Sequence, residues 1–324
     1  MTGWLDVHAH YATERYIAEC QGAGHGKPDG MPAIPAWGVD AALDVMAATD
    51  VAAAVLSISS PGVHFGDDST APNAAARALA AHVNDAGALI VARQPARFGL
   101  SAVLPLPDIE GSLVELARVY DELGADAIAL KTNFHGRYLT DPAFEPVLAE
   151  LQLRAAVVTL HPTSPPCWEA TALGRPRPMI EFIFDTTRCV VDLALSGVLQ
   201  RYPAIRWIVP HAGAALPTVA HRVAALTAIT GEPVDFPAAL RGLYYDLAGV
   251  PVPVALEALL AIVEPGRLLY GSDFPFTPAP VVSALAASLA QSPALALVDL
   301  GITQHSPAAE LFPRLAAAAA PSSQ

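Results

Sequence analysis

The sequence predicts an α/β protein, a (β/α)8 TIM barrel in a single domain with long loops over the C-terminal face of its strands. Eight short apolar runs, each followed by at least one helical segment, indicate alternating strands and helices around a parallel sheet. The 324 residues suffice for one such barrel. No Gly-x-Gly-x-x-Gly loop follows the first run, which disfavours an open doubly wound sheet.

The predicted strands are continuous apolar runs, as expected when both faces of a strand are buried. Prolines or polar residues end them, and Pro105 and Pro107, for example, follow the third run. The predicted strands cover residues 4–10, 51–59, 98–104, 126–131, 155–160, 205–210, 243–246 and 267–270.

The predicted helices carry start and stop signals, such as Pro142 in a first turn and Gly124 after a last turn. They cover residues 40–50, 73–88, 109–123, 141–153, 180–200, 216–230 and 254–263, with one or two more from residue 279. Stretches rich in glycine, proline or polar residues predict loops over 21–38, 60–72 and 162–178. We expect one domain over 1–315 and a frayed tail over 316–324.

The composition disfavours several classes of protein. Apolar residues make up 53% of the chain and charged residues 15%, which indicates a large buried core. The net charge of −13 argues against nucleic acid and against an anionic membrane surface. No apolar run reaches the ~18 residues that span a bilayer. An acidic substrate would need local positive charge, from a metal ion or from a few arginines.

Cysteine usage favours a reducing compartment. Cys20, Cys167 and Cys189 are an odd number without Cys-x-x-Cys spacing, and the N-terminus lacks the basic-then-apolar pattern of a secretory signal. We therefore expect a cytoplasmic protein. Cys167 lies in a proline-rich loop, where we expect an ordinary free thiol rather than a nucleophile.

Polar residues end several of the predicted strands. His8 and His10 end the first, and alternate residues of a strand share a face, so their imidazoles can meet on one ion. His161, His211 and Asp273 follow the fifth, sixth and eighth strands. Because all strands of a barrel end at one face, these side chains should converge. Imidazole and carboxylate ligands suit Zn²⁺ or a neighbouring transition metal.

Each of these residues also has a reading without a metal. A strand-end histidine taken alone is more often a hydrogen-bonded structural residue, and Asp273 could cap the next helix. Lys131 ends the fourth strand, where it could form a salt bridge or contact a substrate carboxylate. The convergence at one rim favours the metal site. Three further histidines lie in predicted mouth loops and could touch substrate: His25, His64 and His135.

Longer motifs surround these residues. They are DVHAHY at 6–11, YLTDPAF at 138–144, TLHPT at 159–163, EFIFDTTR at 181–188, PHAG at 210–213 and YGSDFP at 270–275. Together they resemble one branch of the amidohydrolase superfamily, the aminocarboxymuconate-semialdehyde decarboxylase-like branch, which includes decarboxylases of resorcylate and 6-methylsalicylate type. The resemblance runs from residue 4 to about residue 280, and the stretch ending in Trp37 looks most like the methylsalicylate group.

The resemblance implies a mononuclear site with one divalent metal ion, for which we favour Zn²⁺ and keep Mn²⁺ as the alternative. Its ligands would be His8, His10, His161 and Asp273, with His211 holding water or substrate and assisting proton transfer. Two departures concern neighbouring positions. Ala214 replaces the second glycine of the family motif, which we expect to cost little. Lys131 lies where binuclear relatives carry a carboxylated, bridging lysine, an alternative that we disfavour.

The resemblance also implies nonoxidative decarboxylation of a small hydroxybenzoate-like or unsaturated carboxylic acid, with Asp273 delivering the proton to carbon. The same ligands could instead serve a hydrolase that attacks a lactone or amide with metal-bound hydroxide. A non-catalytic metal-binding protein is a third, weaker reading. We expect a homodimer that acts on a small-molecule carboxylic acid. Its substrate contacts are predicted to be Trp37, Phe184, Phe274 and Arg188, with Phe134 as a further aromatic candidate.

Overall fold

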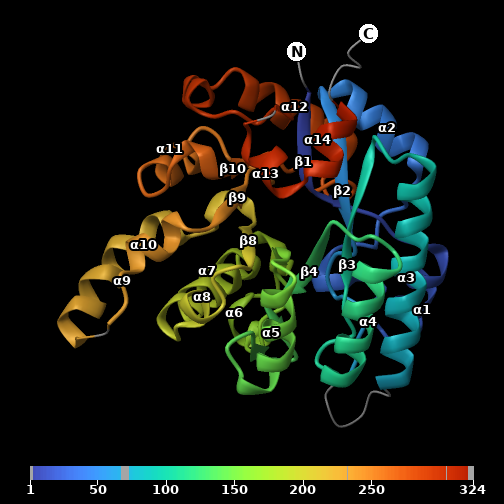
Figure 1. Ribbon diagram of the computed structural model, residues 1–324, viewed down its shortest axis with the longest axis horizontal. Coiled ribbons are helices and arrows are strands. Elements are labelled where there is room, and N and C mark those ends of the chain that lie inside the picture. Colours follow the sequence, from blue (N-terminus) through green and yellow to red (C-terminus); the bar gives the residue numbers. More distant parts are fainter. Residues whose placement is uncertain (1–2, 67–72, 232, 304, 320–324) are drawn as a thin grey trace.

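Eight parallel strands form a barrel surrounded by helices, which confirms the predicted fold class (Figure 1). The computed structural model describes residues 3–66, 73–231, 233–303 and 305–319. Part of the predicted loop at 60–72 and the end of the predicted tail therefore lie outside the described residues. The barrel strands are β1 (Trp4–His10), β2 (Val51–Ser57), β3 (Phe98–Val103), β4 (Ala127–Lys131), β7 (Val157–His161), β8 (Arg206–Val209), β9 (Tyr244–Asp246) and β10 (Leu268–Leu269).

The strands are hydrogen-bonded in chain order, and the first and last meet. A parallel bridge joins Asp6 to Tyr270, and the amide of Val7 donates to the carbonyl of Tyr270 at 2.9 Å. Beyond it, the amide of Asp273 donates to the His8 carbonyl at 2.7 Å. These bonds attach the segment after β10 to β1, so Asp273 is held beside the His8–His10 end of β1.

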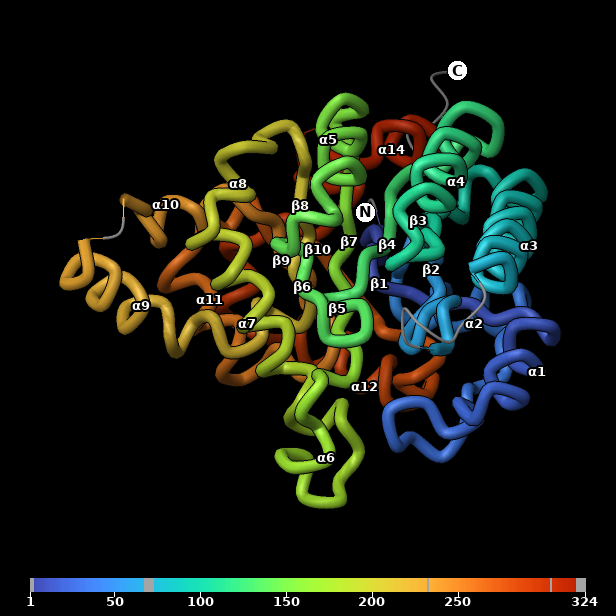
Figure 2. The backbone as a smooth tube through the Cα atoms, turned by 90° about the horizontal axis from the view of Figure 1, so that it is seen from below, coloured from blue at the N-terminus to red at the C-terminus, as the bar shows by residue number. Residues whose placement is uncertain are grey.

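Helices cover the outside of the barrel, as the tube in Figure 2 shows from below. Their bounds are α1 (Glu14–Gly22), α2 (Val39–Ala48), α3 (Asn73–Arg93), α4 (Ile109–Asp121), α5 (Glu145–Leu153), α6 (Trp168–Thr171), α7 (Glu181–Leu195), α8 (Val198–Arg201), α9 (Leu216–Thr230), α10 (Phe236–Arg241), α11 (Ala255–Leu260), α12 (Ala279–Ala290), α13 (Pro307–Leu311) and α14 (Pro313–Ala319). None of the helices in the described ranges is long and apolar enough to cross a membrane.

Several elements differ from the prediction for local reasons. Helix α1 was not anticipated, and Thr13 caps it by accepting a hydrogen bond from the amide of Tyr16 at 3.0 Å. The helix predicted over 180–200 is two helices, because Gly197 breaks it with a left-handed φ of 77°. Helix α10 and the hairpin of β5 (Asn133–Phe134) with β6 (Arg137–Tyr138) were also missed. Helix α14 extends to Ala319, into the predicted tail.

The barrel lumen is packed at the end where the strands begin. Side chains from strands that face one another across the barrel form one buried cluster. Phe312 and Leu315 of the C-terminal segment belong to the same cluster. The hydroxyls of Ser101 on β3 and Thr159 on β7 lie 2.8 Å apart, although β4 separates their strands. This contact therefore crosses the lumen. A larger cluster packs the outer faces of the strands against the helices.

A β-bulge in β1 decides which side chains enter the lumen. Two residues separate Asp6 from Ala9, whereas only one separates their partners on β2, so β1 carries one extra residue. Val7 accordingly packs in the lumen cluster and Ala9 in the outer one, although residues two apart share a face in a regular strand. The bulge thereby turns His8 and His10 toward the lumen.

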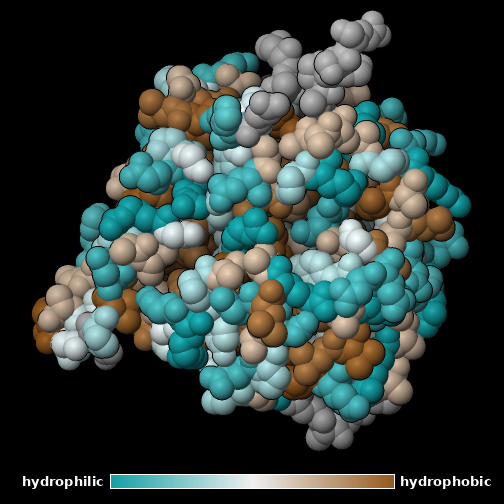
Figure 3. All heavy atoms as spheres, viewed as in Figure 1, coloured by the Kyte–Doolittle hydropathy of each residue, from teal (hydrophilic) through white to brown (hydrophobic). Residues whose placement is uncertain are grey.

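The surface of the protein is mixed in polarity. Figure 3 shows hydrophilic residues over much of the viewed face, with hydrophobic side chains in scattered patches between them. Larger apolar side chains that stay exposed include Met179, Phe184, Val250 and Val254.

Candidate metal centre

Four predicted ligands come together at the C-terminal face of the barrel. One nitrogen from each of His8, His10 and His161 and one carboxylate oxygen of Asp273 lie within 4.8 Å of one another. The three histidines are buried, and Asp273 is partly exposed. The Oδ1 atom of Asp273 lies 3.2 Å from the Nε2 atom of His10 and 3.7 Å from that of His8. The group can therefore hold one divalent metal ion.

Partners at Nδ1 orient the three imidazoles, and the Nε2 atom of His161 also lies 3.3 Å from the hydroxyl of Ser59. Each Nδ1 atom is engaged from behind: that of His8 with Asp246 at 2.8 Å, of His10 with Ser57 at 3.0 Å, and of His161 with the Pro162 carbonyl at 2.7 Å. The Nε2 atoms of His8 and His10 are buried without a hydrogen bond. Buried polar atoms without partners are costly, and coordination of an ion would satisfy them. The residues present thus fit a metal ion.

Asp246 is a functional residue that the sequence reasoning missed. It ends β9 and is buried, and its Oδ1 atom accepts hydrogen bonds from the amides of His211 and Ala248, each at 3.0 Å. Its other oxygen holds His8. One carboxylate therefore fixes both a metal ligand and the turn that carries His211. The sequence could have indicated Asp246, because it is also a polar residue at the end of a predicted strand.

The electrostatics of the centre favour metal binding. Burial alone would lower the pKa of His8, but the Asp246 carboxylate outweighs it and raises this pKa to about 9. Asp246 thus favours positive charge at His8, whether a proton or a metal ion supplies it. Burial lowers the pKa of His10 to about 4 and that of His161 well below its usual value. These two imidazoles are neutral at pH 7, as metal ligands must be.

The carboxylate of Asp273 is likewise in the form that a ligand requires. Burial alone would raise its pKa, but the neighbouring imidazoles of His10, His8 and His211 outweigh this effect and hold the pKa below its ordinary value. Asp273 also adopts a left-handed backbone, with φ of 57°. This conformation turns the chain sharply just after β10 and is uncommon for a non-glycine residue.

His211 lies beside the centre but outside the ligand group. Its ring centroid is 5.2 Å from that of His8, and its Nδ1 atom is buried without a hydrogen bond. The turn that carries it has positive φ at four successive residues, from His211 to Ala214. Ala214 has φ of 56° and ψ of −123°, a region that favours glycine. Ala214, whose replacement of a glycine we expected to cost little, therefore adopts backbone torsions that glycine adopts more readily.

A cavity of about 520 Å³ opens directly onto the metal group. His161, His211 and Asp273 line its floor. Phe276 meets the ring of His10 edge-on at 5.6 Å, and Phe182 meets that of His161 edge-on at 6.2 Å. The remaining lining is largely apolar: Pro28, Met31, Pro178, Met179, Ile183, Ala212, Ala214, Ala248, Val250 and Ala255. The cavity suits a small, flat, mostly apolar molecule with one polar edge.

None of the four predicted substrate contacts lines this cavity. Phe274 packs in the outer core and Phe184 is exposed on α7, while Phe276 and Phe182 occupy the cavity instead. Trp37 packs edge-on against Tyr11 with ring centroids 6.1 Å apart. Arg188 donates to Asp185 and to the Tyr138 hydroxyl, each at 3.2 Å, and so forms a structural ion pair.

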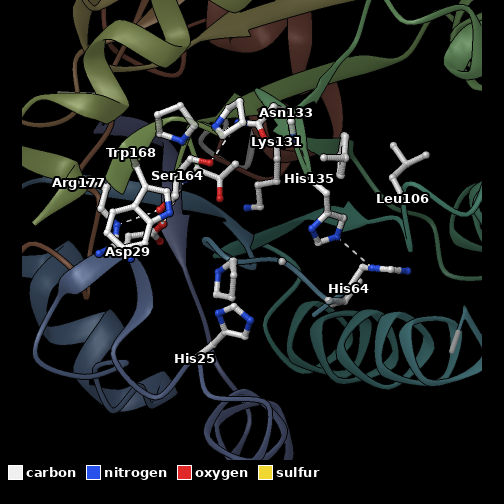
Figure 4. Close-up of a pocket in the computed structure, with 18 of the residues that line it drawn as sticks. His25, Asp29, His64, Leu106, Lys131, Asn133, His135, Ser164, Trp168 and Arg177 are labelled. Atoms are coloured by element: carbon white, nitrogen blue, oxygen red, sulfur yellow. Dashed lines mark hydrogen bonds between the residues drawn. The ribbon is translucent and has the colours of Figure 1, made fainter. Parts of the chain in front are cut away.

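Lys131 and the mouth-loop histidines lie around a second cavity, shown in Figure 4. The ammonium of Lys131 donates to the carbonyl of Ile58 at 2.9 Å. Burial lowers the pKa of this lysine to about 7. The same cavity is lined by His25, His64 and His135. None of these three histidines lines the metal cavity.

A (β/α)8 barrel whose strand ends converge on three buried imidazoles and a carboxylate defines a metal-dependent barrel enzyme. The amidohydrolase family model matches residues 5–308, and the chain belongs to this family. The resemblance inferred from the motifs is thereby confirmed.

Curated relatives and a solved structure are similar over most of the chain. The 6-methylsalicylic acid decarboxylase of Penicillium expansum is 35% identical, over 85% of this chain and 85% of its own length. The 6-methylsalicylic acid decarboxylase acuB of Aspergillus aculeatus is 34% identical, over 96% of each chain. A crystal structure described as an amidohydrolase II is 32% identical with a TM-score of 0.86, covering 97% of this chain and 99% of that chain.

We expect Asp246→Asn to weaken metal binding about 10- to 100-fold, because the amide cannot supply the negative charge that faces His8. The substituted side chain keeps an oxygen for the amides of His211 and Ala248, so the fold should persist. Competition with a chromophoric chelator measures the affinity for Zn²⁺.

The matched control for this substitution is Glu264→Gln, which makes the same chemical change at an exposed position. Its metal affinity should equal that of the unmodified protein. An Asp246→Asn protein that binds Zn²⁺ as tightly as the control would refute the role given to this carboxylate.

Proposed function

We propose that the protein is a metal-dependent nonoxidative decarboxylase of a small hydroxybenzoate-like acid and releases CO₂. The observation that carries the proposal is the metal group at the floor of an aromatic-walled cavity of about 520 Å³. The similarity to two 6-methylsalicylic acid decarboxylases over 85% and 96% of the chain supports the same reaction class.

The cavity walls account for binding of a flat acid. Phe276 and Phe182 line the cavity beside His10 and His161, and aromatic pairs with a bound ring contribute ~0.5–1.5 kcal/mol each beyond burial. No lysine or arginine lines this cavity among the described residues. The carboxylate of the acid is therefore expected to bind at the metal group itself.

We propose Zn²⁺ as the ion, because three imidazoles and one carboxylate are ligands that zinc prefers. A divalent ion held by His8, His10, His161 and Asp273 would supply the positive charge that neutralises the carboxylate and hydroxyl oxygens of the acid.

Decarboxylation replaces the bond between a ring carbon and the carboxylate carbon with a bond to hydrogen. The carbon gains a proton, its bond to the carboxylate breaks, and the electron pair of that bond returns to the ring as CO₂ leaves. The low pKa of Asp273 keeps its carboxylate ionised and able to accept a proton. A bound divalent ion would make the hydroxyl of the acid more acidic, and Asp273 would take that proton and deliver it to the ring carbon. The imidazole of His211, neutral because burial lowers its pKa, stabilises the charge that develops nearby.

Two further proposals concern the protein as a whole. Free thiols at Cys20, Cys167 and Cys189 support a reducing compartment, and we propose the cytoplasm. Exposed apolar side chains near the metal cavity, at Met179, Phe184, Val250 and Val254, support a homodimer. Light scattering of the purified protein tests the dimer, and a monomer at micromolar concentration would contradict it.

We expect the zinc-loaded protein to release CO₂ from one or more members of a hydroxybenzoate panel, measured by membrane-inlet mass spectrometry. Dialysis against a chelator should lower the rate by ~100-fold or more, and one equivalent of Zn²⁺ per chain should restore it. Turnover of lactones without CO₂ release would identify a hydrolase and refute the proposal. Two tightly bound ions per chain would refute the single-metal site.

We expect His211→Gln to keep one metal ion per chain and to lower kcat for CO₂ release by ~10²- to 10⁴-fold, because His211 lies outside the ligand group. Metal content and kcat are measured on the same preparation. The control is His221→Gln, which removes an exposed imidazole on α9 and should leave both values unchanged. A His211→Gln enzyme with undiminished kcat would remove His211 from the mechanism.

A further inference from the structure

A second cavity of about 500 Å³ lies at the same barrel face, beside the ends of β3 and β4. A hydrogen bond of 2.8 Å between two hydroxyls forms part of the wall between the cavities: Ser60 lines the metal cavity, and Thr163 lines the second one. Asp29 borders both. The second cavity contains none of the metal ligands, so it requires its own explanation.

Positive charge gathers in this cavity although the protein is acidic. The chain contains two lysines, Lys27 and Lys131, and both line it, together with Arg177. Lys131 is 3% exposed, and Figure 4 shows its ammonium pointing into the space between Ser164 and His135. Its one hydrogen bond within the described ranges goes to the Ile58 carbonyl, which leaves two of its three donors for a ligand.

Lys131 and Arg177 differ from several other partly buried basic residues in having no carboxylate partner in the part of the chain that the structure describes. Other partly buried arginines of the chain form ion pairs with carboxylates, such as Arg154 with Asp121 at 2.7 Å and Arg314 with Asp126 at 2.7 Å. No carboxylate of the described residues lies within ion-pair distance of Lys131 or Arg177. Burial without an ion-pair partner disfavours the charged form of Lys131, and an anion bound beside it would stabilise that form.

The two carboxylates that line the cavity, Asp29 and Glu169, do not pair with Lys131. The Oδ1 atom of Asp29 accepts hydrogen bonds from the amide and hydroxyl of Ser164, at 3.2 and 2.5 Å, and Glu169 is exposed. The guanidinium of Arg177 lies 4.0 Å above the Trp168 ring and donates to the Ser164 hydroxyl at 3.0 Å. These contacts hold the outer charges along one wall.

The remaining walls are mixed: His25, His64, Asn133 and His135 are polar, and the apolar side chains between them offer a surface on which a flat ring can pack. Leu104 and Leu106 follow β3, Phe134 follows β4, and the Trp168 indole lies beside Arg177. A cavity of this volume with apolar side chains, a few polar groups and one buried lysine is typical of sites for small organic ligands.

We propose that the second cavity binds a planar aromatic carboxylate, with its carboxylate at Lys131 and its ring against Leu104, Leu106 and Phe134. The site is independent of the metal and of turnover. It provides the local positive charge that an acidic protein needs to attract an organic anion to this face.

Equilibrium dialysis with ¹⁴C-benzoate tests the site, because benzoate lacks the hydroxyl that would activate it for decarboxylation. His161→Ala disables the metal group, and this variant should still bind one benzoate per chain. In the same background Lys131→Met should raise the Kd by about tenfold or more, as expected for loss of a charge-assisted hydrogen bond. Methyl benzoate, which has the ring without the charge, should not displace the label.

Arg177→Gln provides a second variant at a half-buried position and should raise the Kd by about fivefold. Arg175→Gln, two residues away and exposed outside the cavity, is its matched control and should leave the Kd unchanged. Absence of binding in His161→Ala, or binding that neither Lys131→Met nor Arg177→Gln weakens, would overturn the proposal. Lysine-dependent benzoate binding in a protein that releases no CO₂ would overturn the decarboxylase proposal alone.

Discussion

The whole site depends on one extra residue in the first strand. With regular alternation after Val7, which packs in the lumen, His8 and His10 would face the surrounding helices instead of the barrel interior. The bulge before Ala9 reverses the alternation. The first strand can then contribute apolar packing to the lower lumen and two imidazoles to the upper rim. Every other member of the metal group is positioned relative to this pair.

The sequence predicted the fold and the convergence of polar strand ends because both follow from rules about strands, whereas the choice of four ligands among these residues came from the family resemblance. Continuous apolar runs mark buried parallel strands, and parallel strands in a barrel bring their last residues to one face. His161 and Asp273 could therefore be placed beside His8, although more than a hundred residues separate His8 from His161 and His161 from Asp273. Asp246 obeys the same rule, and it was overlooked only because a lone carboxylate after a short run looks like an ordinary strand end.

The cavity walls could not be predicted, because loop and helix orientations depend on packing. On α7, Phe182 and Asp185 face inward while Phe184 points to solvent, and the motif alone does not fix that rotation. After β10, the left-handed turn at Asp273 directs Phe276 rather than Phe274 into the cavity. The β1 bulge was likewise invisible, because no glycine or proline in the strand marks it.

The contact between the hydroxyls of Ser60 and Thr163 has an evolutionary consequence. Two chambers of similar size share a thin partition made of small side chains from two loops, and loops tolerate change better than the strands beneath them. A barrel of this design can enlarge its substrate range by opening the partition, without moving a single metal ligand. Bulky or two-ringed acids would then become accessible to the same catalytic apparatus.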